Sequence, residues 1–362
     1  MKIKIADVVV PSKKSVNRAG DVLIGLTPST EDEKAMAQKI FDNWRSLHAY
    51  PINTFQATFR MKLAKLNLKN TLLAQRLKRT PSIVEKLKRP GENRTRLARM
   101  QDIAGIRIVV PKIQDIYTII DDYTKSLNSS NFPHKSINAF NYINEPKLDG
   151  YRSFHQVFEF VTKSNSSLSS LKIELQIRTQ LQHQWATAVE VLGLARETSY
   201  KSGQGDEKHK EFLSICSNLF AIKEGTPIHS KYHTFSELEL CQKLNELNEE
   251  LKIIDSLKAM RVASNRIIED KINKGTKAYL HLILLNLDEK RLRITEYKQS
   301  DSEQAKQRYA FLENKIYSES LNWDVVLVSV DNIDKLKKAF PNYYLDTNEF
   351  IRSVQKYIAK CQ

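Results

Sequence analysis

The stretch KIELQIRT, residues 172–179, alternates apolar and polar residues with a period of two. This is the pattern of a strand that buries one face and leaves the other open. The apolar side chains are expected to face a core, so the polar ones, Glu174, Gln176 and Arg178, share the opposite face. A strand that only faced water would not need a carboxylate, an amide and a guanidinium in line. This polar face is therefore a candidate site.

Similar patterns before and after this stretch predict a sheet interleaved with helices. Strands are expected at 72–77, 102–110, 138–143, 153–161 and 171–178. Helices are expected at 30–49, from 51, from 81, at 113–127, 180–195, 206–223 and 235–270. The alternation predicts an α/β or α+β fold, and of the two we expect α+β, with a mixed β-sheet flanked by helices.

The pattern changes after Gly275. Two strands, KAYLHLILLNL and RLRITEYK, are followed by a helix over 302–318, a strand over 323–330 and a final helical region. This order predicts a small ββαβα domain at the carboxy terminus. We expect one domain over 1–274 and a second over 275–362.

Basic residues outnumber acidic ones, 57 to 42, which gives a formal charge of +15. Such an excess favours polyanionic partners, namely nucleic acid, nucleotides or an anionic membrane surface, although a generally basic protein is the alternative. The three cysteines, Cys216, Cys241 and Cys361, lack the spacing of a zinc site or a disulfide framework. No apolar run approaches the length of a membrane span. We expect a cytoplasmic protein without zinc and without a membrane partner.

The basic residues are concentrated between 60 and 99, where thirteen Lys or Arg accompany two acidic residues. Within this segment, Arg76, Lys78, Ser82 and Lys86 surround a predicted helix start at Pro81. Free backbone N–H groups and the helix dipole favour anions at such a position. The segment is thus a candidate phosphate site, or alternatively a solubilising basic loop.

Two carboxylates stand beside the predicted sheet. Asp102 opens an apolar strand, where an aspartate is more often a turn or cap residue, and Glu174 lies in the middle of another strand. Carboxylates from neighbouring strands could together hold Mg²⁺, which prefers oxygen ligands and bridges polyphosphate oxygens.

A third segment is KLDGYRSFH, residues 147–155. Gly150 allows a tight entry to a strand and places Tyr151 at its exposed end, where a ring either stacks on a base or closes a core. His155 follows on the same strand, and on its own it is a packed histidine.

Together these motifs resemble the RelA/SpoT-type nucleotide pyrophosphokinase domain. The resemblance rests on RLKRTPSIVEKLKR, DIAGIRI, GYRSFH and ELQIRT with the following His183 and Trp185, in this order over roughly 70–200. It implies a nucleotidyltransferase-like sheet that moves pyrophosphate from ATP to a ribose 3′-hydroxyl.

The resemblance also implies roles for individual residues. Asp102 and Glu174 would bind Mg²⁺, and Glu174 would activate the acceptor hydroxyl. Tyr151 would stack on the acceptor base, with Lys147 nearby. The residues implied to contact ATP are Arg76, Lys78, Ser82, Lys86, Arg107, His155, Gln176 and Arg178.

The acceptor that this family usually uses is GTP or GDP, which gives an alarmone. The whole-chain layout, however, resembles the fused toxin–antitoxin form called CapRel, whose carboxy-terminal pseudo-zinc-finger domain covers the ATP site until a phage capsid protein binds. That resemblance implies the 3′-terminal adenosine of tRNA as acceptor, and inhibition of translation. We therefore expect a tRNA-modifying, autoinhibited toxin. The alternatives are an alarmone synthetase and a non-catalytic RNA-binding protein of the same fold.

In that form a YxxY motif inhibits the enzyme. The corresponding segment here is AFPNYYLDTNEF, in which Phe340 replaces the first tyrosine and Tyr343 and Tyr344 follow. These three residues are the predicted autoinhibitory element. The alternative is that their rings close the core of the small domain.

Overall fold

The chain forms a main sheet, a second sheet and a helical bundle. This computed structural model describes residues 9–91, 94–129, 132–163, 165–195, 205–263, 266–269, 280–286, 288–289, 291–319, 321, 323–328 and 347–361. The main sheet has the strand order β1-β2-β5-β4-β3, and its strands are β1 (Leu72–Leu77), β2 (Ala104–Val110), β3 (Lys135–Asn141), β4 (Phe154–Glu159) and β5 (Lys172–Thr179). Among the described strands of this sheet, β2 and β5 pair in parallel and the other neighbours are antiparallel, so the sheet is mixed as predicted.

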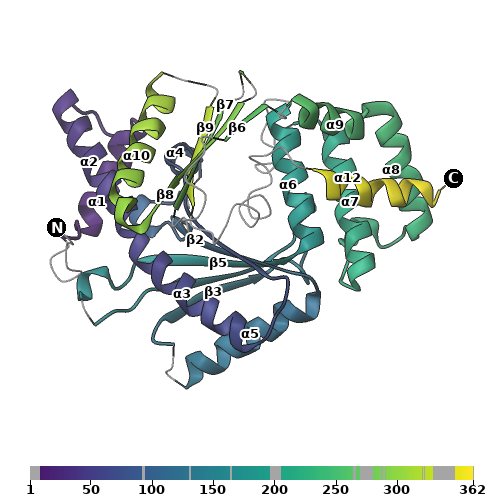
Figure 1. Cartoon of the computed structure of the whole chain (residues 1–362), viewed down its shortest axis with the longest axis horizontal. Coiled ribbons are helices and arrows are strands. Elements are labelled where there is room, and N and C mark those ends of the chain that lie inside the picture. The colour runs from purple at the N-terminus through teal and green to yellow at the C-terminus, as the bar shows by residue number, and fades with distance from the viewer. Residues whose placement is uncertain are drawn as a thin grey trace.

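Helices α3 (Ala49–Lys65) and α5 (Ile113–Asn128) cover one face of the main sheet (Figure 1). The other amino-terminal helices are α1 (Lys13–Leu23), α2 (Glu31–Leu47) and α4 (Thr80–Lys88). Phe55 and Phe59 of α3 pack with Ile173 and the other apolar residues of β5 in one large core. The alternation seen in KIELQIRT therefore sends the apolar side chains toward α3 and α5, and it sends the polar ones to the opposite face.

Residue types at the helix ends account for several boundaries. Thr30 and Glu33 form a reciprocal capping box at the start of α2, where the sequence predicts a helix start. Pro81 lies in the first turn of α4. Asp206 caps the start of α7 (Glu207–Glu224), and Gly225, with a positive φ of 65°, ends this helix.

A helical bundle lies beside the sheets. Its helices are α6 (Gln180–Ala195), α7 (Glu207–Glu224), α8 (Glu237–Leu251), α9 (Ile253–Ala263) and α12 (Asn348–Ala359). The buried side chains of α12, Phe350, Ile351, Val354 and Tyr357, pack with Trp185 and Phe220 in the bundle core. Figure 1 shows α12, in yellow, crossing α7 and α8. The last helix therefore completes the bundle, whereas the sequence predicted that it would complete the small domain.

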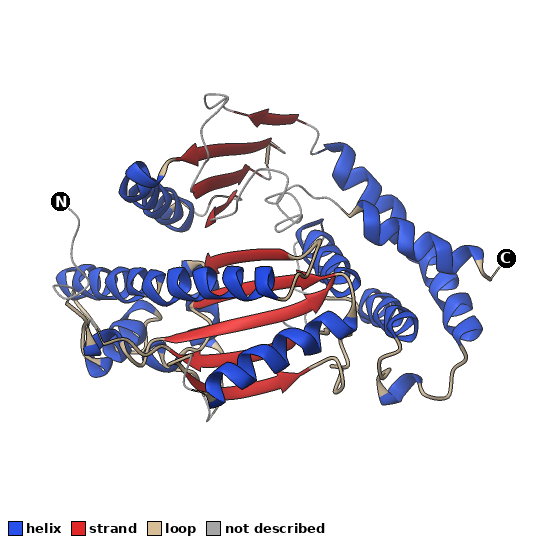
Figure 2. Cartoon of the chain, turned by 60° about the horizontal axis from the view of Figure 1, so that its bottom comes forward, coloured by secondary structure: helices blue, strands red, loops and turns tan. Residues whose placement is uncertain are grey.

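The second sheet has the order β6-β8-β7-β9 and lies against the main sheet (Figure 2). Its strands are β6 (Arg266–Glu269), β7 (Leu280–Asn286), β8 (Arg291–Tyr297) and β9 (Trp323–Val328). Helix α10 (Ser302–Ser318) lies between β8 and β9 in the chain. One face, with Ile283 and Val326, packs on Leu72, Ala74 and Val109 of the main sheet. The opposite face packs on α10. The order is thus helices, main sheet, second sheet and α10.

The structure differs from the sequence prediction around residues 235–270. Two helices replace the single predicted helix, because Lys252 takes the left-handed conformation with φ of 50°. Residues 266–269 then form β6 in parallel with β8. A break at a lysine carries no sequence signal, since the leucine spacing continues past it. The predicted domain boundary at Gly275 lies outside the described residues and stays a prediction, as do Phe340, Tyr343 and Tyr344.

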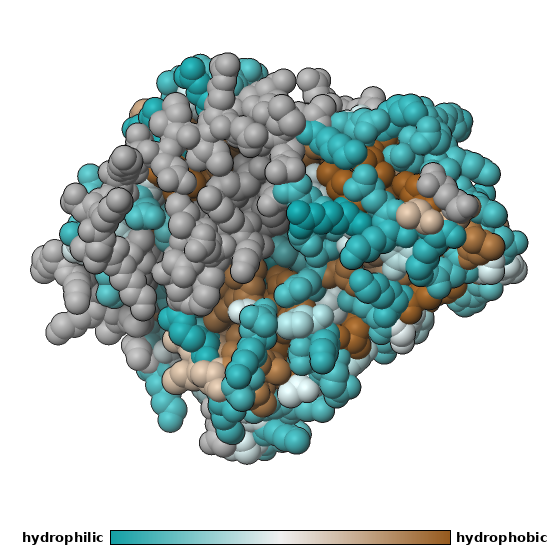
Figure 3. Space-filling model, turned by 45° about the vertical axis from the view of Figure 1, so that its right-hand side comes forward, coloured by the Kyte–Doolittle hydropathy of each residue, from teal (hydrophilic) through white to brown (hydrophobic). Residues whose placement is uncertain are grey.

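Among the described residues seen from the side of the bundle, hydrophilic side chains surround separate hydrophobic patches (Figure 3). Among the helices that the structure describes, none is long and apolar enough to cross a membrane.

Candidate active site

The polar face of β5 meets polar residues of the strands on both sides of it. Gln176 pairs in register with Arg107 of β2 and with His155 of β4. Glu174 pairs with Gly105, whose lack of a side chain leaves room beside the carboxylate. Because side chains alternate across a strand, these polar groups lie on one face of the sheet.

A cleft opens on this face. Its lining is Ala74, Gln75, Arg76, Lys78, Asp102, Gly105, Ile106, Arg107, Glu174 and Gln176. Six of these residues were predicted from sequence to form the site. The structure thus brings the two carboxylates together with cations from the β1–α4 segment, although these elements are separated in sequence.

Asp102 is held between two lysines of the basic segment. Lys78 Nζ lies 2.9 Å from Oδ2 and Lys86 Nζ lies 3.0 Å from Oδ1. Burial raises the pKa of the Asp102 carboxyl, but the two ammonium groups outweigh burial and keep this pKa below its ordinary value. Asp102 is therefore ionised at neutral pH and serves as the negative centre of a cationic cradle.

Glu174 is held by two hydrogen-bond donors. His155 Nδ1 lies 3.0 Å from Oε1, and Gln176 Nε2 donates to Oε2 at 2.6 Å. Burial and the negative charge of Asp102 raise the pKa of Glu174, whereas the hydrogen bonds from His155 and Gln176 lower it. The net effect is a pKa below the ordinary value, so Glu174 is an ionised carboxylate able to accept a proton.

Asp102 and Glu174 are the two carboxylates that the cleft lining offers to a divalent cation. They line the same cleft, and the charge of Asp102 acts on the pKa of Glu174. Among the described residues no group of three or more His, Cys, Asp or Glu could hold a metal. Two protein carboxylates, completed by substrate phosphate oxygens, are the usual ligand set for Mg²⁺ at polyphosphate sites.

The start of α4 is occupied by carboxylates from the second sheet and α10. Glu313 Oε1 accepts a hydrogen bond from the backbone N–H of Thr80 at 2.7 Å. Asp324 of β9 forms an ion pair with Arg79. Ser82 and Lys86 lie on the same helix, half-buried. The predicted anion-binding helix start therefore binds an anion in this structure, and that anion belongs to the chain itself.

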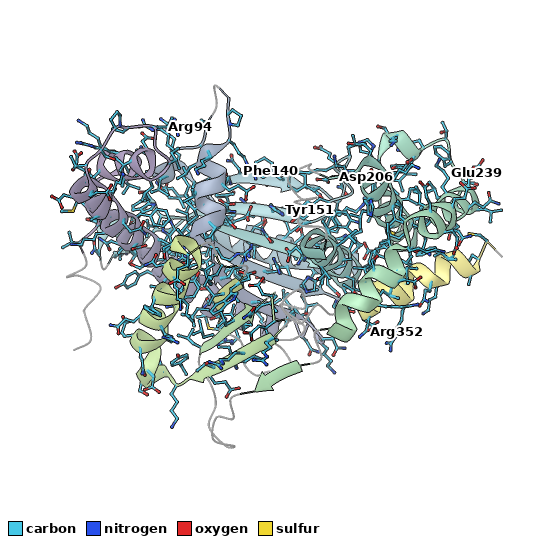
Figure 4. The ribbon with its side chains drawn as sticks, turned by 90° about the horizontal axis from the view of Figure 1, so that it is seen from above. Arg94, Phe140, Tyr151, Asp206, Glu239 and Arg352 are labelled. Atoms are coloured by element: carbon cyan, nitrogen blue, oxygen red, sulfur yellow. The ribbon has the colours of Figure 1, made fainter. Side chains whose placement is uncertain are left out.

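Tyr151 lies at the other end of the cleft face. Its hydroxyl is 2.8 Å from His155 Nε2, and its ring makes edge contacts with Tyr142 and Trp185. Lys147 Nζ lies 5.5 Å from the Tyr151 ring centroid and 4.3 Å from that of Tyr142. Figure 4 shows Phe140 and Tyr151 over the strands of the main sheet.

Gly150 is required where it stands. Its φ of 91° is left-handed, and a Cβ there would lie 3.0 Å from Trp185 Cζ2 and from Ser217 Cβ. The following Arg152 is buried and donates to Ser217, Asn218 and the carbonyl oxygen of Pro227. These contacts fix the loop before β4 against α7, and with it the position of Tyr151.

Two of the residues predicted to contact ATP, Arg178 and His155, are bonded to other protein groups. Arg178 is buried and its guanidinium is hydrogen-bonded to His183; burial lowers its pKa to about 10. His155 has both ring nitrogens engaged, with Tyr151 and with Glu174. Both residues therefore contact protein groups beside the cleft, and their predicted role as ATP ligands stays a prediction.

Other residues of the site gave no usable sequence signal. Phe140 of the edge strand β3 and Tyr142 in the turn after it have rings that are parallel within 3° and 5.9 Å apart, and Phe140 is 40% exposed. Glu313 lies more than two hundred residues from the helix that it caps. Only the tertiary pairing of strands and of the two sheets brings these groups to the site.

Part of the chain that contains the cleft residues is similar to known proteins. Residues 75–205 match the family model described as a region found in RelA / SpoT proteins. Two curated proteins of Bacillus subtilis (strain 168), the GTP pyrophosphokinases YwaC and YjbM, are each 32% identical, over 115 and 143 residues. These alignments cover 31% and 39% of this chain, and the chain spans 52% and 63% of the two relatives.

The chain is also similar to solved structures of small alarmone synthetases. Small alarmone synthetase 2 from Bacillus subtilis is 24% identical, with 51% of this chain and 93% of that chain covered and a TM-score of 0.40. Small alarmone synthetase 1 from Bacillus subtilis, bound to its product pppGpp, is 26% identical, with 51% and 92% covered and a TM-score of 0.40. The matched region 75–205 contains Asp102, Glu174 and Tyr151, whereas the second sheet lies beyond it.

Proposed function

We propose that the chain is an ATP-dependent pyrophosphokinase that transfers pyrophosphate to the 3′-hydroxyl of a guanine nucleotide. The observation that carries this proposal is the shared cleft of Asp102 and Glu174, lined also by Arg76, Lys78 and Arg107. The match of residues 75–205 and the relatives named GTP pyrophosphokinases support it.

In this reaction the ribose oxygen attacks the β-phosphorus of ATP. A bond forms between that oxygen and phosphorus, the bond to the α-phosphate oxygen breaks, and AMP leaves. Glu174 takes the hydroxyl proton, for which its low pKa keeps it ionised. Arg76, Lys78 and Arg107 neutralise the phosphates, with Lys86 at the edge of the cradle. A bound Mg²⁺ would supply further charge neutralisation between Asp102 and Glu174.

The second sheet is proposed to hold the enzyme in an inhibited state. Ala74 both lines the cleft and packs with the second sheet. Glu313 occupies the α4 start, and Asp324 pairs with Arg79 of the same segment. ATP phosphates and these carboxylates would compete for one set of donors. The trigger for release, predicted to be a phage protein, remains a prediction.

A tRNA 3′ end is the second candidate acceptor. The formal charge of +15 favours a polyanion larger than a mononucleotide. The row of rings formed by Phe140, Tyr142 and Tyr151 offers more stacking surface than one base requires. The names of the relatives favour the guanine nucleotide as the acceptor.

Transfer of label from ATP tests the proposal. The full chain and a Glu313→Gln variant would be incubated with γ-³²P-ATP, Mg²⁺ and either GTP, GDP or deacylated tRNA. Label on GTP or GDP is expected. Label confined to the tRNA 3′ end would show that tRNA, and not a guanine nucleotide, is the acceptor. If neither protein transferred label to any acceptor, the proposed pyrophosphokinase activity would be wrong.

A further inference from the structure

We propose that Tyr151 and His155 form a hydrogen-bonded chain that orients the Glu174 carboxylate, so that both are positioning residues for the transfer. The proposal rests on the proposed function, because it assigns Glu174 as the acceptor's base. It gives the Tyr151 hydroxyl a task separate from the stacking that the resemblance assigns to its ring.

The chain has one direction when the imidazole is neutral. Glu174 can only accept a hydrogen bond, so the proton between it and His155 sits on Nδ1, where the separation from Oε1 is 3.0 Å. The other nitrogen, Nε2, then has a lone pair, and Tyr151 donates its hydroxyl proton to it over 2.8 Å. The tyrosine thereby selects the tautomer that faces the carboxylate with a donor.

Each member of the chain is fixed by its own surroundings. The backbone N–H of Tyr151 donates to Asp149 Oδ1 at 2.8 Å, and its ring is in edge contact with Trp185. His155 lies on β4 directly opposite Gln176 of β5. Gln176 holds the second oxygen of Glu174 at 2.6 Å. Both carboxylate oxygens are thus oriented before a substrate arrives, which is what precise placement of a base requires.

The charged and titratable groups around Glu174 come from strands of the main sheet and from the loops at their ends. The negative charge of Asp102 raises the pKa of Glu174. Burial and the charge of Glu174 in turn raise the pKa values of Tyr142 and Tyr151. Cations line the same cleft at Arg76, Lys78 and Arg107. His155 is the group that donates directly to Oε1, so its removal is expected to act on Glu174 first.

Tyr151→Phe separates the two roles of the tyrosine. The variant keeps the ring and removes the hydroxyl. We expect kcat to fall about tenfold, the size of one lost hydrogen bond in a buried site, with little change in KM for the acceptor. Tyr117→Phe is the control, because Tyr117 donates its hydroxyl to Asn144 on the exposed surface. An unchanged kcat in Tyr151→Phe would overturn the proposal.

Two substitutions of His155 supply a rescue. Asparagine places an amide N–H near the position of Nδ1, whereas alanine leaves Glu174 without this donor. We expect kcat to rank wild type, then His155→Asn, then His155→Ala. The acidic limb of the kcat/KM profile should move to higher pH in His155→Ala, since the ionised carboxylate loses a hydrogen bond. Equal losses in both variants with an unmoved pH profile would indicate a merely structural histidine.

Histidine NMR tests the chain without any turnover. In protein labelled with ¹⁵N-histidine and titrated until the His155 ring is neutral, this ring should show the Nδ1–H tautomer, assigned by its absence in His155→Asn. Tyr151→Phe should add an Nε2–H population. An Nε2–H ring in the wild type would refute the chain even if transfer is observed. Conversely, the predicted tautomer in a protein that transfers nothing would leave the chain standing and remove the proposed function.

Discussion

The carboxylate of Glu313 accepts a hydrogen bond from the backbone N–H of Thr80, 2.7 Å away, at the first turn of α4. The same carboxylate pairs with the buried Arg45, whose Nη1 lies 3.0 Å from Oε2. Arg45 also donates to the Lys78 carbonyl and to the Tyr309 hydroxyl. A residue of α10 thus joins the basic segment through an anion where a phosphate is expected.

Glu313→Gln is expected to tighten ATP binding. The amide oxygen can still accept from Thr80, but the negative charge that occupies the helix start is gone. Breaking the buried pair with Arg45 should also lower the free energy of unfolding by about 3 kcal/mol. Calorimetric titration with a non-hydrolysable ATP analogue measures the first effect. Glu303→Gln, an exposed carboxylate of the same helix, is the control. If the variant bound ATP with the affinity of the wild type, Glu313 would have no part in the proposed inhibition.

Asp102→Asn is expected to reduce label transfer at least a hundredfold. The amide has no charge to offer a divalent cation or to balance Lys78 and Lys86. The fold should persist, because the side chain lies at the cleft and outside the apolar core, and circular dichroism would check this. Glu85→Gln on the exposed face of α4 should transfer at the wild-type rate. Substantial activity in Asp102→Asn would exclude the carboxylate as a metal ligand.

Gln176→Leu is expected to move the acidic limb of the pH–rate profile to higher pH. The pKa of Glu174 is depressed in the folded protein, and the Gln176 amide is one cause. A depressed carboxyl pKa contributes stability that is present above the unfolded pKa and lost as pH falls through the folded one. Without this donor the pKa rises, so both activity and that stability are lost earlier on acidification. Gln114→Leu on the surface of α5 is the control; coincident profiles would contradict the assignment.

Phe350→Ala is expected to lower the free energy of unfolding by about 3–5 kcal/mol, the usual cost of a cavity at a buried aromatic. Phe350 is 1% exposed and packs against Phe220 in the bundle. Urea denaturation measures the change, with the exposed neighbour Glu349→Ala as reference. A loss below 1 kcal/mol would mean that α12 does not belong to the bundle core. Truncation from about residue 275 would remove α12 and is therefore expected to destabilise the bundle.

Much of the main sheet could be predicted because its signals are local. The alternation in KIELQIRT, the capping box at Thr30 and Pro81 in the first turn of α4 each act within a few residues. The cleft followed from these elements, since the polar residues of β1, β2 and β5 lie on one face once the strands pair.

The partners of the site residues could not be predicted in the same way. His155 gave no sign that it would join Tyr151 to Glu174, because that depends on the register of β4 with β5. The carboxylates of Glu313 and Asp324 reach the basic segment only through the stacking of two sheets. The end of α8 at Lys252 could not be predicted either, because the helical spacing of the leucines continues past it.

The place of α12 gives the second sheet two covalent anchors, α9 before it and α12 after it, both rooted in the same bundle. Displacing this sheet from the cleft would be a first-order event within one molecule. Its equilibrium constant would not change when the protein is diluted, and the displaced segment would stay at a high local concentration. Reclosure would follow as soon as a trigger dissociates, which makes such a latch resettable.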